Sequence, residues 1–229
     1  MKLRIGVMIG MDYTGLDVAQ AKEQIYNLYD QGKRLANDFS SAEEEFWLKL
    51  SRQWQAPNAK LFQTDLAAPL YNISLTALKA LFEVCRDAVI AYNNLAQSLG
   101  SPTIDDGYFT DSNPDKPNDK HPGGGVGLSD GGGKAAVMDV DGVELTNLWF
   151  REQFDALIKG FNGLPMNIAF YDPDGSIAAS YQTRIKDAAT EVETLSNKVY
   201  SRLDEEIANY RQSVNTGKEQ AVQSFTAKG

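Results

Sequence analysis

The C-terminal part of the chain carries the feature that most constrains its fold, an apolar residue at every third or fourth position from 177 to 214. The series is Ile177, Tyr181, Ile185, Ala188, Val192, Leu195, Val199, Leu203, Ile207, Tyr210 and Val214. Steps of three and four residues put these side chains on one helix face and indicate coiled-coil-like packing. We therefore predict a single long helix, which at 1.5 Å per residue spans roughly 55 Å.

Three similar apolar runs precede this one, at positions 21–50, 59–95 and, shorter, 150–161. A turn with proline separates the runs of each pair, as Trp54-Gln-Ala-Pro57 and Phe170-Tyr-Asp-Pro173. Each pair also opens on Met-Asp-x-x-Gly, from Met11 and from Met138, which offers Asp or Thr as a helix N-cap. The same features in the same order indicate a duplication. We predict an all-α fold of two long helical hairpins, residues 11–99 and 138–229, that form an elongated antiparallel four-helix bundle.

An acidic segment rich in Gly and Pro, residues 100–137, joins the hairpins and is expected to be flexible. Residues 101–143 hold eight Asp against three Lys. The segment is long enough to cross the bundle, which favours antiparallel pairing of the hairpins within one chain and hence a monomer near 25 kDa. In the alternative, each hairpin pairs with a hairpin of another chain.

Some local features modify this picture. Pro69 predicts a kink in the second helix, because its ring clashes with the carbonyl four residues earlier. The sequence Gly160-Phe-Asn-Gly163-Leu-Pro165 is expected to interrupt the third helix. The alternation of apolar residues over positions 3–9 suggests a short strand, with residues 135–140 as its partner.

The composition excludes several classes of function. A net charge of −9 without a basic run argues against binding to nucleic acid or to anionic membrane surfaces. No stretch approaches 18 apolar residues, which argues against membrane insertion. The first ten residues lack the continuous apolar stretch of a signal peptide, so we expect export without a classical signal, or a cytoplasmic protein before export.

No residue pattern predicts catalysis, a cofactor or a metal site. Cys85 and His121 are the only residues of their kinds, and a Cys–His pair would lack a group to orient it. Residues 123–130 approximate a Gly-rich calcium repeat, but in a single copy and with the Asp one place late. The Asp residues at 111, 115 and 119 lack the Gly and Glu of an EF-hand loop. We therefore expect a non-enzymatic protein.

The first hairpin resembles the WXG family of type VII secretion proteins, whose helical hairpins turn at Trp-x-Gly. Trp54 falls 43 residues after Met11, and a long helical run follows it. The resemblance covers residues 11–99 and, more loosely, 138–225. At the turns, Ala56 replaces the family glycine, and the second hairpin has Phe170-Tyr171-Asp172. The turn motif residues are Trp54, Ala56, Pro57, Phe170, Asp172, Pro173 and Gly175.

The resemblance implies a small secreted effector, a chaperone-like partner or an adaptor, without catalysis. The family's export motif, Tyr-x-x-x-Asp/Glu on a second helix, has one candidate, Tyr200-Ser-Arg-Leu-Asp204. Trp54 is expected to close the end of the core, and in the family this region also forms part of the surface that the export machinery recognises. The expected partners are the secretion machinery or another helical protein. The alternatives are a structural or scaffold coiled-coil protein and the export-targeting domain of a toxin.

Overall fold

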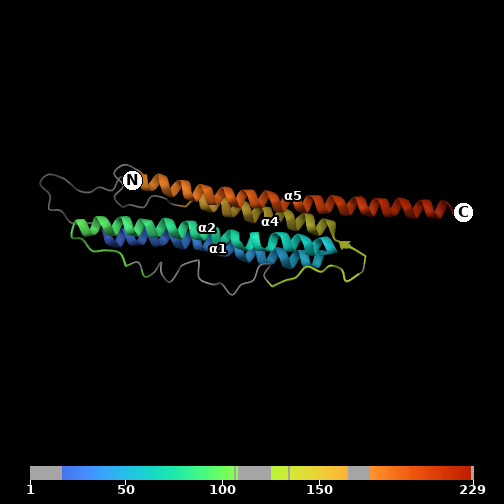
Figure 1. The fold of residues 1–229 in the computed structure, drawn as a ribbon, viewed down its shortest axis with the longest axis horizontal. Coiled ribbons are helices and arrows are strands. Elements are labelled where there is room, and N and C mark those ends of the chain that lie inside the picture. The colour runs from blue at the N-terminus through green and yellow to red at the C-terminus, as the bar shows by residue number, and fades with distance from the viewer. Residues whose placement is uncertain (1–16, 106, 108–124, 134, 165–175, 228–229) are drawn as a thin grey trace. The chain divides into compact units, whose positions relative to one another are not determined.

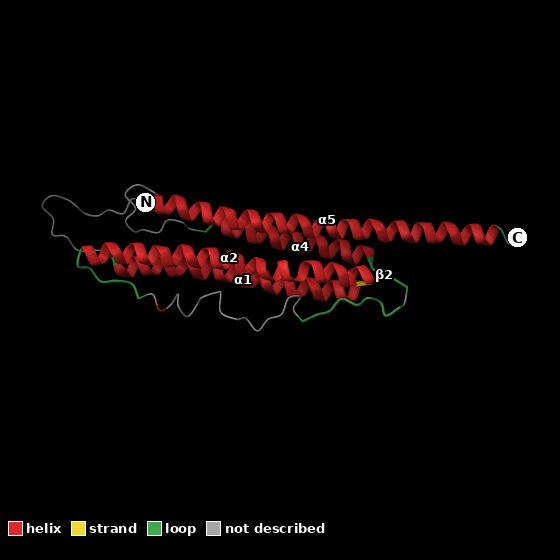
Figure 2. Ribbon diagram, viewed as in Figure 1, coloured by secondary structure: helices red, strands yellow, loops and turns green. Residues whose placement is uncertain are grey.

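The computed structural model describes residues 17–105, 107, 125–133, 135–164 and 176–227. Most of them lie in four helices, α1 (Val18–Gln53), α2 (Pro57–Ser98), α4 (Val140–Asn162) and α5 (Ser176–Thr226) (Figure 1). Two strands of two residues each, β1 (Trp54–Gln55) and β2 (Val137–Met138), pair with each other (Figure 2). The predicted all-α class is confirmed.

Side chains that the sequence places at the helix starts satisfy free backbone N–H groups there. An Asp17 carboxylate oxygen accepts a hydrogen bond from the Gln20 amide at 2.9 Å and caps α1. Asp139 caps α4 in the same way, with the Gly142 amide as donor at 3.1 Å. Pro57 is the first residue of α2, a position where its missing N–H costs nothing.

The chain divides into two compact units, and all four helices contribute to each of them. The first unit includes α1 up to Phe39, α2 from Asn72, α4 from Ala156 and α5 up to Val192. The second unit includes the remaining parts of these helices, together with both strands. Every contact described below lies within one unit.

In the first unit, helices pack closely at glycine. The rings of Tyr29 in α1 and Phe82 in α2 meet edge to face, with centroids 6.0 Å apart. At Gly32, a β-carbon would lie 1.9 Å from the side chain of Leu81, so only glycine leaves room for that leucine. Gly160 of α4 plays the same part toward Leu35 of α1. An ion pair of 2.8 Å between Arg184 and Asp87 connects α5 to α2.

In the second unit, aromatic rings form the core. Phe46 of α1 stacks on Phe150 of α4, with ring centroids 4.0 Å apart. Trp47 of α1 meets Phe62 of α2, and Phe154 of α4 meets Tyr200 of α5, each pair at 6.0 Å. Helices from both hairpins therefore pack on one another within a single chain, as expected for a helical bundle.

The second hairpin begins beside the turn of the first. Trp54 pairs with Met138 and Gln55 pairs with Val137, in antiparallel register. The Asp139 amide donates a hydrogen bond of 2.7 Å to the Gln53 carbonyl, one residue before α4 starts. In this unit, the start of α4 thus lies at the turn of the first hairpin, which is the arrangement predicted for antiparallel hairpins.

The local features expected from the sequence have different outcomes. The expected interruption of the third helix is confirmed, because α4 ends at Asn162, within the segment from Gly160 to Pro165. Residues 135–140 do contain a strand, but its observed partner is β1, and positions 3–9 lie outside the described residues. Helix α2 runs through Pro69 without a break, and the kink expected there stays a prediction.

The seam of α5 is buried as far as Ile207, apart from half-buried Leu195; its first residue, Ile177, has no described side chain. Tyr210 and Val214, the last residues of the predicted series, are half-buried. The seam therefore packs over most, and not all, of its predicted length.

Two amide side chains of α2 hold the described ends of the connecting segment. In the first unit, Asn93 donates to the Ile104 carbonyl at 2.9 Å and accepts from the Ile104 amide at 2.7 Å. In the second unit, Gln63 donates to the Val126 carbonyl and accepts from the Leu128 amide at 2.7 Å. Ile104 and Leu128 are both buried. These ends therefore make more contact with α2 than a flexible segment would.

Candidate functional site

The turn of the first hairpin buries the residue that identifies the motif. Trp54 is 0% exposed, and its ring lies 5.5 Å from that of Phe62, centroid to centroid. Its indole nitrogen is also buried and has no hydrogen-bond acceptor among the described residues. Trp54 thus closes the core of the second unit, and its ring does not form part of an accessible surface.

The neighbouring motif residues shape the backbone of the turn. Ala56 is buried, and its amide donates a hydrogen bond of 3.1 Å to the Ser129 carbonyl. Among the described residues, only glycines have a positive φ, so this turn does not need the family glycine at position 56. Pro57 is exposed at the start of α2. The residues of the second turn, Phe170, Asp172, Pro173 and Gly175, lie outside the described residues.

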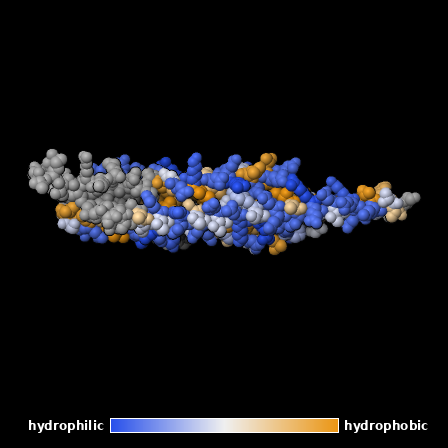
Figure 3. Space-filling model, turned by 90° about the horizontal axis from the view of Figure 1, so that it is seen from above, coloured by the Kyte–Doolittle hydropathy of each residue, from blue (hydrophilic) through white to orange (hydrophobic). Residues whose placement is uncertain are grey.

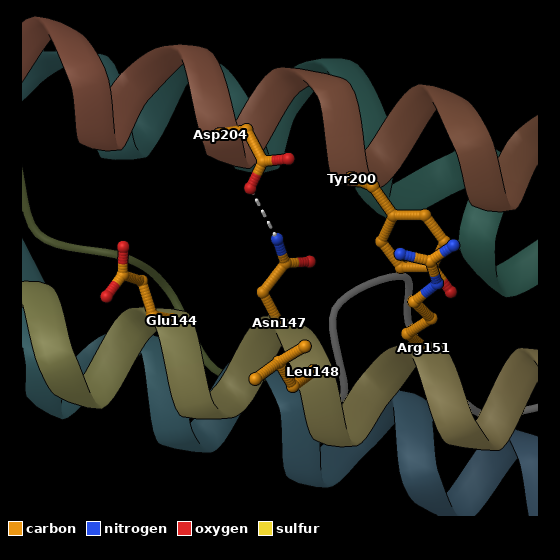
Figure 4. Close-up of a pocket in the computed structure, with 6 residues that line it drawn as sticks. All are labelled: Glu144, Asn147, Leu148, Arg151, Tyr200 and Asp204. Carbon is orange, nitrogen blue, oxygen red and sulfur yellow. Dashed lines mark hydrogen bonds between the residues drawn. The ribbon is translucent and has the colours of Figure 1, made fainter.

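Tyr200 and Asp204, the predicted export motif, lie on α5 in the second unit (Figure 4). The Tyr200 side chain is buried between helices, with its ring edge to face against Phe154. The Arg151 guanidinium stands over the same ring, 5.1 Å from its centroid. Asp204, one turn further on, is exposed and accepts a hydrogen bond of 3.1 Å from the Asn147 side-chain amide. The two motif residues therefore have different environments.

An open pocket of about 260 Å³ lies where these residues meet, between α4 and α5. Its lining residues are Glu144, Asn147, Leu148, Arg151, Tyr200 and Asp204. Figure 4 shows Asp204 and Asn147 pointing toward each other across the pocket, with Arg151 reaching to the Tyr200 ring. Leu148 is 59% exposed and gives the pocket an apolar wall. The pocket thus combines two carboxylates, one guanidinium and one exposed leucine.

Ion pairs fix the helices around this pocket. Arg211 of α5 reaches Glu144 of α4 at 2.9 Å. Arg202 connects α5 to Asp65 of α2 at 3.4 Å, and Asn58 donates a hydrogen bond to the buried carboxylate of Glu206. The first contact joins α4 to α5 beside the pocket, and the other two join α2 to α5 in the same unit.

Burial raises the pKa of two residues that the sequence analysis singled out, Tyr200 and Cys85. Desolvation raises the pKa of the Tyr200 phenol to about 12, and its hydroxyl, buried among the described residues, has no hydrogen-bond partner there. Burial likewise raises the pKa of the Cys85 thiol well above its usual range. A protonated, fully buried thiol is a poor nucleophile. His121 lies outside the described residues.

Sequence reasoning found one side of the pocket and missed the other. It selected Tyr200 and Asp204 from their spacing, but it gave no role to Asn147, Leu148 or Arg151 of α4. Those residues stand at helical spacing on α4, and Leu148 is exposed there together with Leu145, three residues earlier. Only the pairing of α4 with α5 brings them to the motif.

Comparison of the chain with protein-family models, with curated proteins and with solved structures gave no match. Among the described residues, no cluster of three or more His, Cys, Asp or Glu is arranged to hold a metal ion. In the same part of the chain, no helix is both long and apolar enough to span a membrane.

Proposed function

We propose that this chain is a non-enzymatic substrate or adaptor of a type VII secretion system and acts through contacts with other proteins. The observation that supports this best is the position of Asp204. The acidic residue of the Tyr-x-x-x-Asp motif is exposed at an open pocket, one helical turn from a buried tyrosine that fixes its surroundings. A partner can reach this carboxylate without unfolding the bundle.

The two residues of the motif have distinct parts in this proposal. Asp204 makes the contact with the partner, together with exposed Leu148 on the opposite side of the pocket. Tyr200 acts as a positioning residue, because its ring is packed between Phe154 and Arg151. The bundle itself is complete within one chain, so the fold requires no second copy.

A secretion assay with matched variants tests the proposal. The wild-type chain, expressed in a strain with a working type VII system, should accumulate in the medium and stay in the cells when that system is deleted. The Asp204→Asn variant keeps a side-chain oxygen for the Asn147 amide and removes the charge. Its secretion should fall about tenfold, because a hydrogen bond to a charged group is worth roughly 1.5–3 kcal/mol.

The control is Glu205→Gln, which removes one charge from the next residue of the same helix, where the side chain is also exposed. This variant should be secreted as well as the wild type. A cytosolic marker protein measures lysis, and circular dichroism of the purified variants checks their folding. Secretion that is independent of the type VII system, or equal for Asp204→Asn and the wild type, contradicts the proposal.

Replacement of either motif residue by Ala is informative only at Asp204. Tyr200→Ala would remove a buried ring and destabilise the bundle by about 3–5 kcal/mol, whatever its part in export. Tyr200→Phe keeps the ring and removes only the hydroxyl. We expect this variant to be secreted normally if Tyr200 acts through its packing.

A further inference from the structure

Helix α5 continues well beyond the last residue that it buries. Ile207 is 3% exposed, whereas Tyr210 and Val214 are half-buried and every other residue from 211 to 226 is exposed. We call residues 210–226 the α5 tail. In Figure 3 this end of the chain shows hydrophobic residues in an otherwise hydrophilic segment. Two of them are Val222 and Phe225, which are 63% and 86% exposed.

The α5 tail keeps the apolar period of the packed part of the helix. After Tyr210, the same face carries Val214, Gly217, Ala221 and Phe225, at steps of four, three, four and four residues. Upstream, this period defines the face that packs in the core, ending with Leu203 and Ile207. The exposed stripe is therefore a continuation of an interface that already exists inside the chain.

The tail's own sequence gives its helix little support. Residues 213–217, Ser-Val-Asn-Thr-Gly, are all weak helix formers, and the glycine alone costs about 1 kcal/mol relative to alanine. Isolated helices of about 15 residues are marginal in water even with favourable sequences. Although the tail extends a helix that is already packed, a packing partner would stabilise the helix over these residues.

We propose that this partner is the α5 tail of a second copy of the chain, in antiparallel orientation. A two-fold axis between Gly217 and Lys218 places Tyr210 opposite Phe225 of the second copy. The same register places Val214 opposite Ala221 of the second copy. One register thus matches the apolar positions at both ends, and the missing side chain of Gly217 lets the two backbones approach at the centre. Such a contact is isologous, as in most protein dimers.

This pairing leaves each bundle as it is. The hairpins of one chain remain packed on each other, and the dimer adds a contact outside the bundle. It replaces the expectation of a simple monomer, and it is independent of any part in secretion. Because only about four helical turns are in contact, the interface is small, and we expect dissociation at about micromolar concentration.

Light scattering of the full-length protein across a concentration series tests the association. The wild-type mass should rise from 25.2 kDa toward twice that value. Val214→Lys and Phe225→Lys place a charge in the stripe and should weaken the association about tenfold or more. The matched control is Gln223→Lys, which adds the same charge at an exposed residue on the opposite face and should leave the association unchanged. A wild-type protein that remains at 25.2 kDa at all concentrations overturns the proposal.

Disulfide cross-linking tests the register. Gly217→Cys introduces a thiol beside the two-fold axis, where an added β-carbon meets no atom within 4 Å. On oxidation this variant should form a covalent dimer. Phe225→Cys should not, because its two copies would lie about 22 Å apart, beyond the roughly 4–7 Å between Cα atoms that a disulfide spans. The native Cys85 is buried and contributes no background. A cross-link at Phe225→Cys but not at Gly217→Cys rules out this antiparallel register.

Discussion

The ring of Phe46 in α1 stacks on the ring of Phe150 in α4, with centroids 4.0 Å apart and planes 14° from parallel. Both side chains are completely buried, and each also touches a further aromatic ring, Trp47 and Phe154 respectively. Because α1 belongs to the first hairpin and α4 to the second, this stacked pair joins the two hairpins.

Removal of one of these rings should weaken the whole bundle. Phe150→Ala is expected to lower the free energy of unfolding by about 3–5 kcal/mol, through lost burial and the cavity left behind. Chemical denaturation of the purified protein measures the change. Leu145→Ala, on the same helix but 68% exposed, should change it by less than about 0.5 kcal/mol. Equal losses in both variants would show that this core is not as described.

Two leucines of α5 should differ although the sequence assigns them to one seam. Leu203 is fully buried, so Leu203→Ala should cost about 2–5 kcal/mol. Leu195 is half-buried, and Leu195→Ala should cost clearly less. Denaturation curves of the two variants, recorded in parallel, decide the order. The reverse order would mean that α5 is rotated about its axis.

Glycines within the helices should respond to alanine according to the space around them. At Gly32, the new methyl group would stand where Leu81 now packs, so we expect a loss of about 1–3 kcal/mol despite the better helix propensity. Gly217 faces open space, and Gly217→Ala should not lower stability. Thermal melting at a dilution where the protein is monomeric compares the two. A stabilised Gly32→Ala variant would contradict the close packing at this position.

Alkaline pH should unfold the protein in a range set partly by Tyr200. Its pKa is raised to about 12 in the folded chain, from an ordinary value of about 10. The unfolded chain therefore loses this proton first, and stability, complete below about pH 10, falls as the pH rises toward 12. Tyr29, with a pKa also raised to about 12, adds to the effect. Tyr200→Phe should make the decline shallower when unfolding is followed against pH, whereas an unchanged decline would show that Tyr200 ionises freely.

The helices and their buried faces could be predicted because they follow from local periodicity. Positions such as Phe46, Leu81 and Leu203 fall on a repeating apolar face, and burial followed that face. The residues at which the helices begin and end were harder to predict from the sequence. Asp17 caps α1. The sequence alone could not single it out, because several Asp and Thr residues in this stretch are chemically capable of the same bond.

The pocket and the attachments of the connecting segment depend on contacts between distant residues. Asn147 and Asp204 are 57 positions apart, and no local pattern connects them. In the sequence, Gln63 and Asn93 are ordinary polar residues of a helix surface. Their role appears only in the structure, where they bond to the backbone of the connecting segment. The exposed Asp204 was predictable as a motif residue, but the burial of Tyr200 depended on the position of α4.

The pairing of Trp54 with Met138 joins residues more than eighty positions apart, and this separation has a consequence for synthesis on the ribosome. Helices α1 and α2 are complete when Ser98 has been made, whereas α5 ends at Thr226. At about 5–20 residues per second, the remaining stretch takes roughly 6–25 s. During the first half of that interval, before α4 is complete at Asn162, Phe46 and its neighbours lack the aromatic cover that α4 later supplies. The newborn first hairpin therefore exposes an apolar helix face to the cell until its own second half covers it.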